Sequence, residues 1–316
     1  MKKRDFIKMG GFAGLALGVS SQSQAMEEGA ACTQETGFLL IHGSWHGAWA
    51  WTPVMHHLNV AGYQTLAIDL PGHGLDTILP DSFTSRPLDM AAFASEPSSL
   101  ASYSIADYEA AVLDGARKAQ AAGIKRLIAV GHSMGGVPLT FAASRAPELF
   151  ASLVYLAALT PTKGKPAGAY LQLKDQVENS QLGPAILADP AVVGALRIDP
   201  RSQDEGYLTR FKTALAADVD DKLLGAVKHL LTPDAPVSLY GESLTLSAGY
   251  GDLPKRFIRA IHDKTLLPST AQAIVKDVND NWPHQRCDMI DIATSHEVMF
   301  ANPRLLSDLL IEAAKG

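Results

Sequence analysis

The chain has 316 residues, of which 47% are hydrophobic and 19% are charged, so it can bury the core of one large or two small globular domains. Its formal net charge is −6, and its Lys and Arg residues are scattered rather than gathered in a basic stripe, which excludes nucleic acid as an expected partner. Beyond the N-terminus there is no run of roughly 18 apolar residues, so we expect no stable membrane insertion.

Residues 1–25 have the pattern of an export signal. A basic start, MKKRDFIKMG, is followed by the short apolar run GFAGLALGV and by the small residues SQA, which end at Ala25. We therefore expect an exported protein, either periplasmic or secreted. The stretch KRDFIK is similar to the twin-arginine export motif, but Lys3 stands where the first arginine belongs, so the export route stays open. The alternative is a disordered N-terminal tail.

The chain contains two cysteines, Cys32 and Cys287. Export would permit a disulfide between them, but two cysteines do not make a disulfide framework. The simpler interpretation is one thiol in the N-terminal segment and another in a loop.

From residue 36 onward, strand-like and helix-like segments alternate. Short apolar runs that predict buried strands are GFLLIHG, YQTLAID, IKRLIAVGHS, LFASLVYLAAL, KRFIRAIHD and DMIDIATSH. The clearest helix spans residues 104–122, because Ser104 and Asp107 have capping-box spacing and Gly123 is a stop signal. A last helix opens at Asn302 and Pro303. Such alternation predicts a mostly parallel sheet with helices on both faces.

Two stretches interrupt the alternation. Residues 75–102 are rich in Pro, Ser and Asp and predict a long loop. Residues 161–250 are mostly helical, with no clear buried strand, and predict an inserted helical cap between core segments 37–160 and 251–316. We expect the loop to border the same opening as the cap. Its apolar residues would then pack under the cap or line the entrance; they are Leu79, Phe83, Leu88, Met90 and Phe93.

The strand at IKRLIAV runs directly into Gly131-His132-Ser133-Met134-Gly135, and a helix follows. A sharp turn from strand to helix would bring the residues two before and two after the serine against neighbouring backbone, which requires glycine at both places. The turn also puts the hydroxyl near free N–H groups at the helix start, which favour developing negative charge. The pattern predicts that Ser133 is a nucleophile. The alternative is a glycine-rich connection with a solvated serine.

A serine nucleophile needs a base, and the base needs an orienting carboxylate. His296 follows the last strand-like run, at the sheet edge where open α/β sheets keep their sites. Asp263 ends the run before it, so the chain order of nucleophile, acid and base agrees with a known arrangement. Other acids precede a strand or lie within one: Asp252, Asp288 and Asp291.

Two backbone N–H groups are expected to bind the oxyanion of a tetrahedral intermediate. One belongs to Met134, which follows the serine, and the other to Ser44, which follows the tight turn at Gly43 after the first strand. The aromatic residues of this loop either wall the pocket or pack against the sheet.

The motifs FLLIHGSWHGAWAW, VGHSMGGVP, AIHDK and TSHEVMFANPRLLSDLL make the chain resemble the α/β-hydrolase superfamily from about residue 37 to the C-terminus. More narrowly, it resembles the branch of salicylate-type methyl esterases, hydroxynitrile lyases and related bacterial esterases. The resemblance implies an α/β-hydrolase fold, a triad of Ser133, Asp263 and His296, no cofactor or metal, and a pocket between core and cap.

Membership of this branch leaves the reaction open. Its hydroxynitrile lyases carry threonine after the first-strand histidine and lysine after the catalytic histidine, where this chain has Gly43 and Glu297. A carboxylate would repel cyanide, so an esterase is favoured. The interpretation is a serine hydrolase acting on small, largely hydrophobic carboxylic esters through an acyl-enzyme. The alternatives are other triad chemistry (lactonase, thioesterase, amidase or lyase) and a non-catalytic binding protein. The sequence does not predict the oligomeric state.

Overall fold

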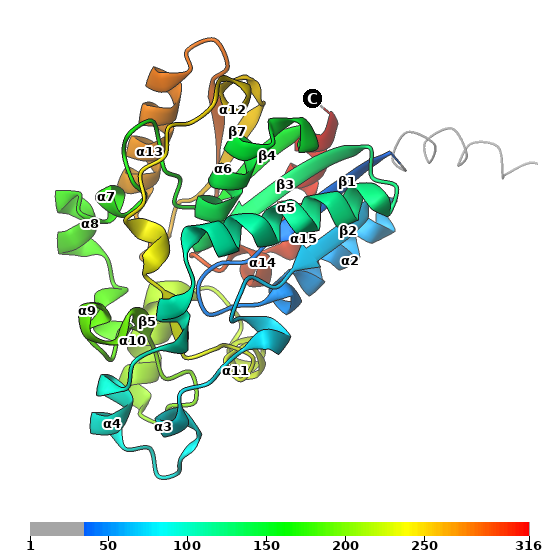
Figure 1. The fold of residues 1–316 in the computed structure, drawn as a ribbon. Coiled ribbons are helices and arrows are strands. Elements are labelled where there is room, and N and C mark those ends of the chain that lie inside the picture. Colours follow the sequence, from blue (N-terminus) through cyan, green and yellow to red (C-terminus); the bar gives the residue numbers. More distant parts are fainter. Residues whose placement is uncertain (1–34, 316) are drawn as a thin grey trace, which may run out of the picture.

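The computed structural model describes residues 35–315. The expected export signal at 1–25 and Cys32 lie outside these residues. A six-stranded sheet, with every neighbouring pair parallel and strand order β2-β1-β3-β4-β7-β8, forms the centre of the fold (Figure 1). Its strands are β1 (Thr36–Ile41), β2 (Gln64–Ile68), β3 (Arg126–His132), β4 (Ser152–Leu156), β7 (Lys255–Ala260) and β8 (Cys287–Ile292).

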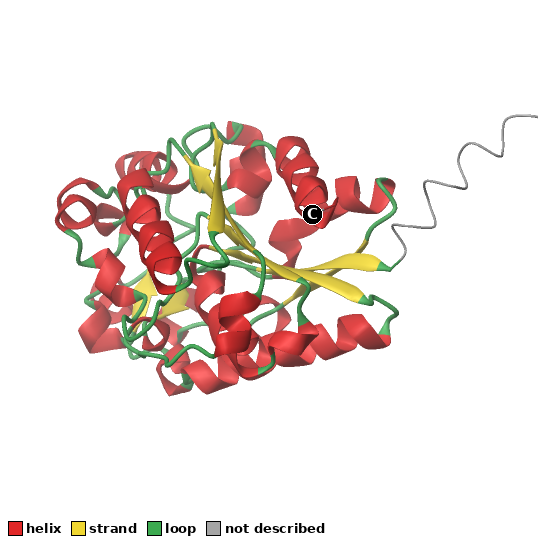
Figure 2. Ribbon diagram, turned by 90° about the horizontal axis from the view of Figure 1, so that it is seen from above, coloured by secondary structure: helices red, strands yellow, loops and turns green. Residues whose placement is uncertain are grey.

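Helices cover both faces of this sheet (Figure 2). The main ones are α2 (Thr52–Val60), α5 (Ile105–Ala121), α6 (Gly136–Arg145), α13 (Pro268–Asn281), α14 (Val298–Ala301) and α15 (Pro303–Lys315). Successive side chains of a strand point to opposite faces. On β1, Leu39 and Ile41 accordingly join a core with α5, α6 and α13, while Phe38 and Leu40 join a second core with α2 and α15. The predicted α/β-hydrolase fold class is confirmed.

Helix α5 begins where its sequence signals indicate. The Asp107 carboxylate accepts the backbone N–H of Ser104 at 2.8 Å, and after the helix Gly123 has a φ of +102°, a backbone conformation that favours glycine. The apolar face of the helix is fully buried through Tyr108 and Val112.

A long insertion separates β4 from β7; most of it lies beyond the carboxyl-terminal edge of the sheet, whereas its last helix directly precedes the start of β7 (Figure 1). Its helices are α7 (Gly168–Leu171), α8 (Lys174–Asn179), α9 (Pro190–Val193), α10 (Glu205–Leu215), α11 (Asp221–Val227) and α12 (Ala248–Asp252). The expectation of no buried strand here is wrong, because β5 (Ala195–Arg197) and β6 (Asp234–Pro236) form a two-stranded antiparallel sheet. Three-residue strands are too short to show an alternating pattern.

Residues 75–102 are not a simple loop. They contain α3 (Asp81–Thr84) and α4 (Met90–Ser95), and both Phe83 and Phe93 are fully buried. The two rings lie 5.5 Å apart, and the Arg197 guanidinium of β5 lies 5.0 Å from the Phe93 ring centre. These aromatic residues therefore join the segment to the insertion. Met90 is exposed.

The remaining short elements are 3-10 turns: η1 (Ala48–Trp51), η2 (Gly74–Asp76), η3 (Ser99–Ser102), η4 (Ser133–Gly135), η5 (Pro147–Leu149), η6 (Gly183–Ala185) and η7 (Ser238–Tyr240). Across residues 35–315, no helix combines the length and apolar character needed to cross a bilayer. On β8, Cys287 is buried and has no disulfide partner within the same residues.

Candidate active site

Ser133 occupies the turn between β3 and α6 with a φ of +51°. This value lies in the left-handed region, which residues other than glycine rarely adopt. The neighbouring glycines explain how this turn closes. A Cβ at position 131 would lie 2.9 Å from the Gly135 carbonyl oxygen, and one at position 135 would lie 2.5 Å from the His42 carbonyl oxygen. Both glycines are therefore sterically required, as the motif predicts.

The structure brings the three predicted triad residues into one hydrogen-bonded row. The Ser133 Oγ lies 2.9 Å from His296 Nε2, and His296 Nδ1 lies 2.6 Å from Asp263 Oδ2. These groups come from the ends of β3, β8 and β7, all at the same edge of the sheet. Since the carboxylate accepts the Nδ1 proton, Nε2 is free to accept the proton of the serine hydroxyl.

Asp263 is held in place through its second oxygen. Oδ1 accepts the backbone N–H of Thr265 at 2.7 Å and that of Leu266 at 3.0 Å, and the side chain is buried. The competing acids lie elsewhere: Asp252 pairs with His284, and Asp291 pairs with Arg259. Only Asp263, among the acids that the sequence offered for this role, contacts His296.

The electrostatic surroundings of His296 favour its protonated form. Burial lowers the pKa of this imidazole, but the charge of Asp263, its hydrogen bond and the charge of Glu297 outweigh burial and raise the pKa above its ordinary value. His132, which precedes the serine, contributes a second contact, since its Nε2 lies 3.1 Å from the His296 carbonyl oxygen. Burial holds the pKa of His132 well below its usual value, so its ring is neutral and donates this bond.

The two residues expected to bind an oxyanion flank Ser133. Met134 follows it directly and is fully buried. On the other side, Gly43 packs so closely that a Cβ there would lie 2.9 Å from the Ser133 Cβ. Within residues 35–315, no hydrogen bond uses the backbone N–H of Ser44, the next residue. This N–H group is therefore unpaired among the described residues.

Several contacts around the site were not predicted. The Tyr240 hydroxyl, from the insertion, lies 3.4 Å from Ser44 Oγ, and the Asp218 carboxylate accepts the Ser295 backbone N–H at 2.9 Å. His46 and Glu297 are also in contact, with 3.3 Å between Nε2 and Oε2. The residues of each contact are far apart in the sequence, so no local spacing signals them.

Chemically, the row of serine, imidazole and carboxylate can activate a hydroxyl for attack on a carbonyl carbon. Within the described residues no group of three or more His, Cys, Asp or Glu side chains is arranged to hold a metal ion.

Comparison with known proteins places this geometry in a family. The sequence profile of the alpha/beta hydrolase family matches residues 38–309. The chain belongs to this family. Esterase PIR7B of Oryza sativa subsp. japonica is 28% identical over 297 residues, which cover 88% of this chain and 95% of the rice protein. Methylesterase 1 of Arabidopsis thaliana is 28% identical over 286 residues, which cover 88% of this chain and 95% of the Arabidopsis protein.

Solved structures agree on the fold. A pyrethroid hydrolase from Sphingobium faniae JZ-2 superposes with a TM-score of 0.69 at 20% identity, covering 89% of this chain and 98% of that one. A polyneuridine aldehyde esterase superposes with a TM-score of 0.63 at 18% identity, and the match covers 89% of this chain and 99% of that one. The family, and the esterase branch that its relatives represent, confirm the prediction of a carboxylic ester hydrolase at the level of enzyme class.

Proposed function

We propose that this protein is a serine esterase that cleaves small, largely hydrophobic carboxylic esters through an acyl-enzyme. The observation that carries the proposal is the row of 2.9 Å and 2.6 Å contacts that joins the Ser133 hydroxyl through His296 to Asp263. An activated serine at the edge of a parallel sheet, with a free N–H group beside it, is suited to acyl transfer.

In the proposed reaction, Ser133 Oγ attacks the ester carbonyl carbon while its proton passes to His296 Nε2. The carbonyl oxygen becomes an oxyanion that accepts the backbone N–H groups of Ser44 and Met134. When the bond to the alcohol breaks, His296 returns the proton to the leaving oxygen. Water then attacks the acyl-enzyme by the same route and releases the acid.

The proposed substrate class rests on the insertion, for which we propose residues 161–250 as a cap over core segments 37–160 and 251–316. The cap side of the site offers the Tyr240 ring, and the loop after β1 offers Trp45, whose indole N–H donates to the Leu196 carbonyl oxygen of β5 at 2.8 Å. Pockets of this kind bind apolar groups and use few polar contacts to orient them. Because several relatives are named methylesterases, methyl esters of aromatic and aliphatic acids are suitable first substrates.

The decisive experiment compares wild type with Ser133→Ala on chromogenic short-chain esters and on this methyl ester series. We expect the variant to lose turnover by on the order of 10⁴- to 10⁶-fold, as other triad enzymes do. Ser95→Ala, at an exposed position on α4, is the matched control and should keep full activity. If Ser133→Ala turns over an ester at a rate near that of wild type, the nucleophile is misassigned.

A further inference from the structure

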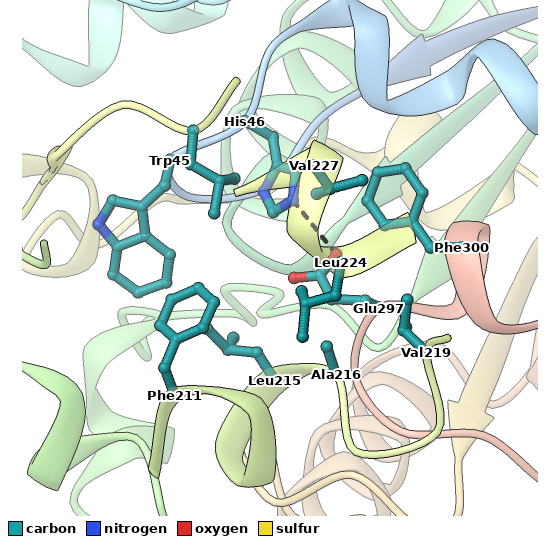
Figure 3. Close-up of a pocket in the computed structure, with 11 residues that line it drawn as sticks. Trp45, His46, Phe211, Leu215, Ala216, Val219, Leu224, Val227, Glu297 and Phe300 are labelled. Carbon is teal, nitrogen blue, oxygen red and sulfur yellow. Dashed lines mark ion pairs between the residues drawn. The ribbon is translucent and has the colours of Figure 1, made fainter. Parts of the chain in front are cut away.

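One imidazole joins the two loops that carry the proposed oxyanion donor and the proposed base. His46 Nδ1 lies 2.7 Å from the Ser44 carbonyl oxygen, and Nε2 lies 3.3 Å from Glu297 Oε2. Figure 3 shows the two side chains facing each other across the end of a pocket. Their exposed fractions are only 4% and 7%, so both polar groups are withdrawn from water.

The chemistry of these contacts fixes where the protons are. A carbonyl oxygen only accepts hydrogen bonds, so Nδ1 of His46 carries a hydrogen. If Nε2 and the Glu297 carboxylate were both unprotonated, two lone pairs would face each other at 3.3 Å in a buried place. The contact is therefore attractive only when Nε2 also carries a hydrogen, and Oε2 of Glu297 accepts no hydrogen bond among the described residues.

The walls around the pair leave few other partners. They are apolar or aromatic side chains from α10, α11 and α14, among them Phe211, Leu224 and Phe300. The pocket leaves only about 10 Å³ for the centre of a water molecule, so its walls pack closely around the pair. In such surroundings the effective dielectric constant is low, which strengthens any electrostatic attraction between the two side chains.

We propose that His46 and Glu297 are positioning residues that hold the Ser44 loop and the His296 loop in register. The contact from His46 Nδ1 reaches the residue whose N–H would bind the oxyanion, and Glu297 is bonded in sequence to the base. Neither side chain reaches the reacting atoms; each acts through its neighbour. The inference rests on the proposed esterase function and names the groups that keep the oxyanion donor aligned with the base.

The other titratable groups near the pair are His42, His73, His132 and His296. The His132 ring lies 6.3 Å from that of His46 and comes from β3, and Asp263 contacts His296 from the loop after β7. The insertion packed against the cavity contributes apolar side chains there, and the Leu215 carbonyl oxygen accepts the Glu297 N–H at 3.1 Å.

The test distinguishes the contact between His46 and Glu297 from the charge on the Glu297 side chain. Glu297→Met keeps the side-chain volume but removes the contact, whereas the amide of Glu297→Gln can still donate to a neutral imidazole. For ester hydrolysis, each at its own pH plateau, we expect Glu297→Met to lower kcat by on the order of 10- to 10²-fold, the scale of a misplacement near 1 Å. KM should stay within about threefold, and Glu297→Gln should keep most of kcat because the link survives.

Two substitutions of His46 examine each end of the link. His46→Asn retains a donor toward Ser44 and loses Glu297, whereas His46→Gln retains a group toward Glu297 and loses Ser44. Both should lower kcat as Glu297→Met does, and combining His46→Asn with Glu297→Met should cost no more than the worse single change. Leu224→Ala, in the same cavity wall, is the control and should leave kcat unchanged.

Unfolding curves and labelling of Ser133 by a fluorophosphonate separate the outcomes. If folded Glu297→Met keeps the wild-type kcat, or if Glu297→Gln falls as far as Glu297→Met, the positioning role is overturned. An effect on KM alone overturns it as well. Should a His46 variant fail to fold, the comparison of Glu297→Met with Glu297→Gln decides. If wild type itself neither cleaves esters nor reacts with the fluorophosphonate, the proposed function fails instead.

Discussion

The charge on His296 is the residue-scale quantity that most directly controls the proposed chemistry. The base must be neutral to accept the serine proton, yet Asp263 and Glu297 both stabilise its protonated form. In the proposed mechanism, Asp263 sets the tautomer of this base through its contact with Nδ1. The site therefore obtains an oriented base at the expense of activity in acid.

This balance predicts the pH dependence of kcat/KM. Since the surroundings raise the pKa of His296, the rising limb of the profile should have its midpoint above the pKa of an ordinary histidine, and activity should be lost as the pH falls through it. Glu297→Gln removes one stabilising charge, so its midpoint should move to lower pH. Steady-state kinetics from pH 5 to 9 on wild type, Glu297→Gln and the control Leu224→Ala would measure this shift. A midpoint in Glu297→Gln that stays in place or rises would contradict it.

The sequence predicts some residues of the site better than others. Gly131, Ser133 and Gly135 are local to one turn, and the collisions that demand glycine follow from the turn itself. His296 and Asp263 were predictable because parallel strands end at a common edge. The pairing of His46 with Glu297 was not, because it depends on how the loop after β1 meets the loop after β8.

At the scale of elements, the Arg197 side chain of β5 fastens residues 75–102 to the insertion. It is fully buried and forms two bonds of 2.7 Å to the Asp234 carboxylate on β6. Its remaining donors reach the Phe93 and Glu96 carbonyl oxygens. A short sheet and a short helix, neither stable alone, are thus joined by one guanidinium.

Because this ion pair is buried, removing one partner should be costly. Arg197→Met leaves the Asp234 carboxylate buried without its cation, and we expect the free energy of unfolding to fall by about 3–5 kcal/mol. The double variant Arg197→Met/Asp234→Leu should be less destabilised than this single variant. Urea unfolding of both proteins measures the difference. Equal stability of Arg197→Met and wild type would mean that the buried ion pair makes no net contribution to the free energy of unfolding.

These elements were poorly predicted for physical reasons. Strand β6 is Asp-Ala-Pro and β5 has three residues, so neither shows a strand pattern. Helices α3 and α4, of four and six residues, are held by tertiary contacts more than by helix propensity. By contrast, α5 has seventeen residues and its own capping box, and its sequence predicted it well. Helix α13, between β7 and β8, was not predicted.

At the scale of the whole molecule, we propose that the protein is exported. The first 25 residues carry the basic, apolar and small-residue pattern of a signal peptide. Expressed in a bacterial host, the protein should appear in the periplasm or medium with its N-terminus after Ala25. N-terminal sequencing and intact mass of the fractionated protein would measure this, with a variant lacking residues 2–25 as the control that stays inside. An intact N-terminus in the cytoplasmic fraction would refute the proposal.

The insertion is bonded to the loop that carries His296. Leu215, at the end of α10, accepts the Glu297 N–H, and Asp218 accepts the Ser295 N–H, so residues on both sides of the histidine depend on the insertion. An engineer who replaced this insertion with one from a relative, to change substrate preference, would also remove two supports of the base. Selectivity and catalytic competence are therefore not interchangeable modules in this enzyme. A working chimera would have to carry Leu215 and Asp218 across the junction along with the core.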